Sequence, residues 1–135
     1  MKKSRKYPKT SAEVDGLASE LIARVADRWT MEVLEALGEV ETLRFTRLAD
    51  AIPGISQKML TQTLRQMERD GLVRRTVQAV IPPHVDYSLT PLGDSLGAAF
   101  CGVWLWAERN VASVVKARAT FDAKNPKAAL KLKRR

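Results

Sequence analysis

The chain has 135 residues, of which 45% are hydrophobic and 28% are charged, a balance typical of one globular domain rather than a disordered chain. A single cysteine excludes an internal disulfide framework and favours a reducing compartment. The net charge of +8 gathers at the ends, because residues 1–9 carry five Lys or Arg and no acid, and residues 116–135 carry eight against Asp122 alone. We expect a flexible basic arm over 1–9, a folded domain over 10–115 and a fraying basic tail over 116–135.

No segment of the chain has the pattern of a secretory signal or of a membrane-spanning helix. The basic start is followed by "SAEVDGLASE", where a secretory signal would need an apolar segment. The longest near-apolar run, residues 97–107, is too short to cross a bilayer. The sequence therefore predicts a soluble, cytoplasmic protein.

Two amphipathic helices are expected first. Thr10 and Glu13 have the spacing of a capping box, and apolar residues follow at 14, 17, 18, 21, 22 and 25. Asp27 can cap a second helix that ends at Gly38. The apolar stripe of that second helix comprises Trp29, Val33, Leu34 and Leu37.

A helix-turn-helix pattern follows the short link "ETLRF". Residues 45–52 form about two turns of helix, and Pro53-Gly54 favours a tight turn. Ser56 caps a longer helix over 56–70, with Ile55 and Leu60 placed as a hydrophobic staple and Gly71 at its end.

The rest of the domain reads as a hairpin and one long helix. Residues 72–80 and 85–90 have strand character around a Pro-Pro tip. Thr90-Pro91 opens the last helix, whose residues 92–115 are apolar on more than one face. Since one small domain cannot cover all those faces, we expect a second copy to cover one of them.

The outer face of the 56–70 helix carries the functional prediction. Residues 44–75 hold seven basic residues against three acids, whereas residues 10–43 hold two against eight. With Leu60, Leu64 and Met67 buried, the opposite face presents long polar and basic side chains that can read base edges in a major groove. The predicted base contacts are Gln57, Lys58, Thr61, Gln62 and Arg65. The predicted phosphate-backbone contacts are Arg44, Arg47, Ser56, Arg69, Arg74, Arg75 and His84.

The stretch "RFTRLADAIPGISQKMLTQTLRQMERDGLVRR…IPPHVDYSLTPLGDSL" resembles the HxlR-type winged helix-turn-helix transcription regulators, relatives of the MarR group. "DRWTMEVLEAL" also looks like that family's "GKW" helix, and the similarity spans about residues 16–107. It implies a mainly α (α+β) fold, a winged helix-turn-helix with a two-stranded wing and terminal dimerisation helices.

The resemblance also implies a homodimer that binds a specific, pseudo-palindromic operator in double-stranded DNA. Residues 56–70 would be the recognition helix and residues 72–89 the wing, on the DNA backbone or in the minor groove. The first and last helices would form the dimer interface, for which we name Leu17, Leu21, Leu96, Phe100, Val103 and Trp106.

Three positions depart from the family pattern. Gly16 stands where many members carry a cysteine, thirteen residues before the tryptophan matching Trp29, that some use to sense electrophiles or oxidants. The one thiol, Cys101, is expected to be buried and inert on the apolar last helix. His84 replaces a usual Arg or Lys in the wing, so its backbone contact would be weaker or depend on pH.

Three other functions compete with that of a sequence-specific DNA-binding regulator. An enzyme is rejected, because one His and one Cys supply no catalytic constellation, and no cofactor or metal is expected. A non-specific nucleic-acid or anionic-surface binder driven by the basic tails is the main alternative. A regulator responding to a small-molecule effector, with a pocket near Trp29, Trp104 and Trp106, also stays open.

Overall fold

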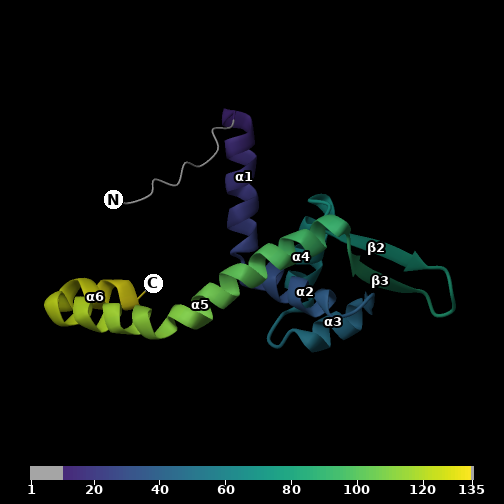
Figure 1. The fold of residues 1–135 in the computed structure, drawn as a ribbon. Coiled ribbons are helices and arrows are strands. Elements are labelled where there is room, and N and C mark those ends of the chain that lie inside the picture. The colour runs from purple at the N-terminus through teal and green to yellow at the C-terminus, as the bar shows by residue number, and fades with distance from the viewer. Residues whose placement is uncertain (1–10, 135) are drawn as a thin grey trace. The chain divides into compact units, whose positions relative to one another are not determined.

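The computed structural model describes residues 11–134 and divides into two units, one ending at Gly97 and the other beginning at Ala98. The first unit contains α1 (Ala12–Val25), α2 (Arg28–Gly38), β1 (Leu43–Arg44), α3 (Phe45–Ala51), α4 (Gln57–Arg69), β2 (Val73–Gln78), β3 (His84–Leu89) and the start of α5 (Pro91–Lys124) (Figure 1). The second unit contains the rest of α5 and α6 (Pro126–Lys133). The boundary falls inside residues 10–115, so the domain limits drawn from the sequence stay a prediction. Among residues 11–134, no helix combines the length and apolarity needed to span a bilayer.

The first two helices begin at side-chain caps. The Ser11 hydroxyl accepts a hydrogen bond from the Val14 amide at 3.3 Å, so the cap of α1 is Ser11. The predicted cap, Thr10, is one residue too early and lies outside the described residues. Asp27 caps α2 as predicted, its carboxylate accepting from the Thr30 amide at 3.3 Å.

The core of the first unit comes from α2, α3, α4 and the sheet. Its buried members are Val33, Leu34, Leu37, Leu48, Ile52, Leu60, Leu64, Met67, Leu72, Val73 and Tyr87. Three of the four residues in the predicted α2 stripe are therefore confirmed as core, while Trp29 is half-buried at its edge. α1 contributes no buried residue at all. Fully burying side chains of this size stabilises the fold by about 1.5–3 kcal/mol each, so α2–α4 form the rigid body that carries the candidate site.

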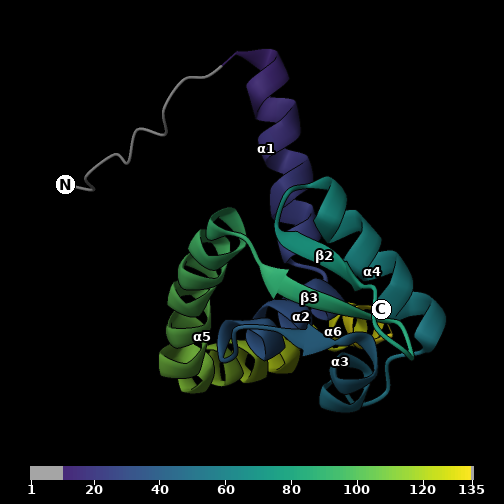
Figure 2. The same ribbon diagram turned by 90° about the vertical axis from the view of Figure 1, so that its right-hand side faces the viewer.

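The sheet has three strands, not the two that the sequence predicted for the wing. β3 lies between β1 and β2 and is antiparallel to both, with Leu43 opposite Tyr87 and Arg44 opposite Asp86 (Figure 2). β1 is only two residues long, too short for an alternating pattern to reveal it, and the sequence analysis treated it as a link. The predicted hairpin itself is confirmed as β2 and β3.

The predicted fraying of the chain after residue 115 is wrong. α5 continues to Lys124, and α6 packs back beside the end of α5 with Ala129 buried (Figure 1). Within this hairpin, Lys133 Nζ lies 3.6 Å from Asp122 Oδ2. Pro126 occupies the first turn of α6, where its missing N–H costs nothing.

Candidate nucleic-acid interface

α4 is fixed at both ends and along one side. Ser56 Oγ accepts from the Met59 amide at 3.0 Å, which confirms the predicted cap. After the last turn, the Gly71 amide donates to Glu68 O at 3.0 Å and the Leu72 amide to Met67 O at 2.9 Å, with Gly71 at φ +78°. This pair of bonds is a Schellman motif, which favours glycine at that position. The helix therefore has little freedom to rotate about its axis.

Its buried and exposed faces lie where the sequence placed them. Leu60, Leu64 and Met67 are buried, as is Thr63. All the predicted base-contacting residues are exposed. Lys58, Gln62 and Arg65 lie opposite the buried stripe, and Gln57 and Thr61 flank that face. Arg69, assigned to the backbone, is also exposed. α4 thus offers donors, acceptors and one methyl group on a single free face.

Two residues of that face already have partners. Thr61 Oγ1 donates to the Gln57 carbonyl at 2.8 Å, so its methyl group remains the natural contact for a thymine methyl. Arg65 Nη1 lies 3.3 Å from Glu68 Oε1, an i,i+3 pair that the sequence analysis did not consider. The carboxylate of Glu68 will therefore influence how Arg65 meets DNA.

The two arginines of the wing do not point the same way. In an antiparallel pair, residues directly opposite share a face. Arg75 lies opposite Tyr87, whose ring is buried, whereas Arg74 lies opposite Ser88. Both side chains are exposed, but Arg74 belongs to the outer sheet face together with Arg44, while Arg75 belongs to the face toward the core. The two arginines therefore lie on opposite faces of the sheet, and their contacts with the DNA backbone stay a prediction.

Arg44, Arg47 and His84 come together around one open groove of about 740 Å³. Arg44 belongs to β1 and occupies the N-cap position of α3, where its side chain makes no capping hydrogen bond. The full lining is Thr42, Leu43, Arg44, Thr46, Arg47, Asp50, His84 and Asp86. Its two arginines are balanced by two aspartates, which makes it a weaker phosphate site than basic residues alone would be.

His84 is half-buried and already has an acidic neighbour. Its Nε2 lies 3.6 Å from Asp86 Oδ1, and Gln78 Nε2 donates to the other oxygen of Asp86 at 3.1 Å. The Asp86 carboxylate beside His84 would repel a phosphate group at this position. This contact gives a physical reason for expecting His84 to hold DNA less firmly than an Arg or Lys would.

The residues predicted for the dimer interface differ in their solvent exposure. Leu17, Val103 and Trp106 are exposed, Leu21 and Phe100 are half-buried, and Leu96 packs against the core of its own unit. Cys101 is exposed, so the expectation of a buried thiol is wrong. Trp104 is exposed as well, and no tryptophan lines the groove around Arg44, Arg47 and His84.

Removing the cap of α4 gives a first test of this geometry. Ser56→Ala should lower the free energy of unfolding by about 1 kcal/mol, because the Met59 amide loses its partner. Urea denaturation at fixed protein concentration would measure the change. Ser95→Ala is the matched control, since Ser95 Oγ donates to the Leu92 carbonyl within a helix and contributes no cap. Equal losses in both variants would contradict the capping role.

A short helix, a tight turn at Gly54, a second helix with an exposed polar face and a hairpin together define a winged helix-turn-helix, a DNA-binding fold. The model of the HxlR-like helix-turn-helix family matches residues 24–114, more than half of the chain. The chain belongs to this family and is a helix-turn-helix transcriptional regulator. α6 and the end of α5 lie beyond the matched range.

Individual relatives agree with this assignment. The uncharacterised HTH-type transcriptional regulator YtfH of Escherichia coli (strain K12) is 41% identical over 99 residues, which are 73% of this chain and 78% of the relative. The structure of the ytfH protein from Salmonella typhimurium has a TM-score of 0.66 and 38% identity, covering 76% of this chain and 90% of that one. The reduced form of the transcriptional regulator YodB from B. subtilis has a TM-score of 0.63 and 29% identity, covering 75% and 94%. These relatives are named as regulators and not as enzymes, which favours a non-catalytic role.

Proposed function

We propose that the protein acts in the cytoplasm as a homodimer that binds a pseudo-palindromic operator in double-stranded DNA. α4 enters the major groove, and the β2–β3 wing contacts the backbone or the minor groove. The observation that carries this proposal is the outer face of α4, where five exposed polar side chains can pair with base edges. A binder driven only by charge would not need that face.

Dimerisation is proposed from the apolar surface of α1 and α5. Val14, Leu17 and Ile22 are exposed on α1, and α5 exposes Val103, Trp104, Leu105 and Trp106. Such contiguous apolar residues on a helix are typical of an interface. A two-fold dimer would place its two recognition helices in successive major grooves when half-sites lie about one helical turn, or about 34 Å, apart.

Selection of bound sequences from a random duplex pool tests the proposal. The full chain should enrich a motif with two-fold symmetry, at both low and moderate salt. Enrichment without a motif, lost as salt rises, would instead support binding through charge alone.

A substitution in the wing distinguishes contacts with the DNA backbone from contacts with the bases. Arg74→Ala should weaken binding to all duplexes alike and reduce the slope of log K against log salt by about 1, because one phosphate contact is lost. Titrations at several salt concentrations, with the selected operator and a scrambled duplex, would measure it. Arg28→Ala is the control, since Arg28 belongs to α2 and not to the wing, where it pairs with Glu32 and lies over the Trp29 ring. A loss confined to the operator would contradict a backbone role for Arg74.

A second candidate function, non-specific binding to nucleic acid, rests on the C-terminal hairpin. Residues 116–134 carry seven Lys or Arg against Asp122, which already pairs with Lys133. The helices of this hairpin display those charges on an ordered surface. Replacing Lys127, Lys131 and Arg134 together by glutamine should lower affinity for every duplex equally while the selected motif persists. Loss of all binding in this variant, when the full chain selects no motif, would favour this second function over the first.

A redox or small-molecule effector is a separate question within the same proposal. The family's sensing position holds Gly16, which cannot form a thiolate, so a response through that position is not proposed. Cys101 is exposed on α5 and is the residue that thiol reagents would reach. An effector could still act through the proposed dimer helices.

A further inference from the structure

α1 is the least anchored helix of the first unit. None of its residues is buried, and none belongs to the set packed against the core. Figures 1 and 2 show it extending away from α2 and α4 as a single rod. Only Leu21, Arg24 and Val25 of α1 are half-buried and its other residues are exposed, so the contacts of its last two turns decide its direction.

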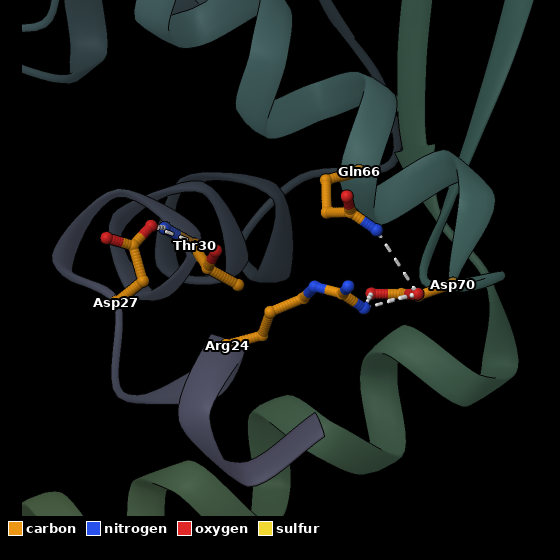
Figure 3. A network of polar contacts seen from close by, with 5 residues as sticks. All are labelled: Arg24, Asp27, Thr30, Gln66 and Asp70. Atoms are coloured by element: carbon orange, nitrogen blue, oxygen red, sulfur yellow. Dashed lines mark hydrogen bonds and ion pairs between the residues drawn. The ribbon is translucent and has the colours of Figure 1, made fainter. Parts of the chain in front are cut away.

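The last turn of α1 reaches α4 through Arg24 (Figure 3). Arg24 Nη1 donates to Asp70 Oδ1 at 2.8 Å and to Oδ2 at 2.7 Å. Gln66, one turn earlier on α4, has its amide nitrogen 3.5 Å from Asp70 Oδ1. With that amide turned by 180°, its oxygen accepts from both terminal nitrogens of Arg24 at 3.3 Å. The guanidinium thus contacts two positions along the recognition helix.

This ion pair differs from the others in the described chain. The side chain of Asp70 is 11% exposed, the least of any acid in an ion pair within residues 11–134. Asp70 is also the C-cap of α4, where the negative end of the helix dipole disfavours a carboxylate. Arg24 supplies the cation that this acid needs. The pair is part-buried, and an ion pair removed from water adds little net stability, whereas in some proteins it fixes geometry.

We infer that Arg24 is a positioning residue that holds α1 at a set angle to α4 and thereby selects the spacing between operator half-sites. The inference rests on the proposed homodimer, in which the apolar face of α1 meets a second copy. If α1 is part of the interface, its angle to α4 determines how far apart the two recognition helices lie. A spacer change of one base pair rotates one half-site by about 36° relative to the other, so small changes in that angle affect binding.

A duplex library with fixed half-sites and spacers of varied length tests the inference. The half-sites are those that the wild-type protein selects from a random pool. The wild-type protein should favour one spacing by about tenfold over its neighbours, within the usual range for coupling between two sites. Arg24→Ala should reduce that preference to about threefold or less while base preference inside each half-site is unchanged.

Three further variants separate positioning from stability. Arg28→Ala removes the exposed pair with Glu32 only four residues away and should keep the wild-type spacing preference. Asp70→Asn keeps the shape of the side chain, removes the charge, and should broaden the spacing as Arg24→Ala does. Arg24→Asp combined with Asp70→Arg restores an ion pair of reversed sign and should recover the narrow spacing. Circular dichroism identifies any variant that fails to fold. The spacing preferences of the folded variants then test the inference.

The outcomes are distinct. If folded Arg24→Ala or Asp70→Asn keeps the wild-type preference for one half-site spacing, the inference is wrong and the proposed function still stands. A half-site preference that changes together with spacing also overturns it, because Arg24 would then be acting on the reading face itself. A wild-type protein that selects no paired motif overturns both the inference and the proposed homodimeric function.

Discussion

Replacing Gly93 with alanine is expected to lower the free energy of unfolding of the first unit by about 3 kcal/mol, the upper range for overpacking. Gly93 is buried in the first turn of α5, and a Cβ there would overlap the carbonyl oxygen of Leu72. It would also lie 3.2 Å from Leu89 Cδ2. Because the main clash is with backbone, a side-chain rotation cannot relieve it.

The same junction holds the end of α4. The Leu72 carbonyl accepts from the Thr90 amide at 3.1 Å, and Thr90 Oγ1 accepts from the Gly93 amide at 3.1 Å while donating to the Gly71 carbonyl. Moving α5 away from Leu72 would break this set of bonds directly after the recognition helix. Gly93→Ala should therefore weaken operator binding as well as stability.

Gly97→Ala is the matched control for this prediction. Gly97 lies one turn further along α5, and a Cβ there meets nothing within 4 Å. In an open helical position, alanine should stabilise the protein by about 0.5–1 kcal/mol relative to glycine. Urea denaturation should be measured at one protein concentration, because association shifts apparent stability. Shifts of the same sign in both variants would contradict the close approach at Gly93.

The sequence was sufficient for the parts of the fold that depend on local signals. Ser56 and Asp27 cap helices because their side chains accept bonds from amides three residues on, and such spacing is visible in the sequence. The buried stripe of α4 follows from helical periodicity in the same way. These local rules placed the exposed polar face of α4 without any tertiary information.

Local sequence patterns do not predict the contacts between distant segments of the chain. Arg24 and Asp70 are 46 residues apart, and nothing in the sequence singles out this arginine from Arg28. β1 exists only because β3 offers an edge to pair with, since two residues have no periodicity of their own. Asp86 lies beside Arg44 and Arg47 in one groove, and only the fold brings it next to these distant residues of the chain.

The Arg65–Glu68 pair is an intermediate case, because i,i+3 spacing is visible in the sequence. The scarcity of acids over residues 44–75 predicts DNA binding, but that count does not show that Glu68 pairs with Arg65. In the folded chain the Arg65 side chain remains 63% exposed beside that carboxylate. Its contribution to binding must be measured with Glu68 taken into account.

Arg65→Ala is expected to relax base preference at particular operator positions by about 1–3 kcal/mol per base pair, the usual worth of a good direct contact. It should also lower affinity for every duplex, because Glu68 then faces the phosphates without its partner. Gln62→Ala should relax preference at other positions without that general loss, since Gln62 is exposed and carries no charge. Binding to a panel of single-base operator variants would measure both effects.

The double variant Arg65→Ala with Glu68→Gln separates the two contributions of Arg65. Removing the unpaired carboxylate should recover the general affinity while the relaxed preference remains. Glu68→Gln alone should bind all duplexes more tightly than the wild-type protein and keep its base preference, because Arg65 is freed and not lost. If Arg65→Ala instead changes affinity uniformly across the panel, as Arg74→Ala is expected to do, Arg65 contacts the backbone and the reading face of α4 is limited to its first two turns.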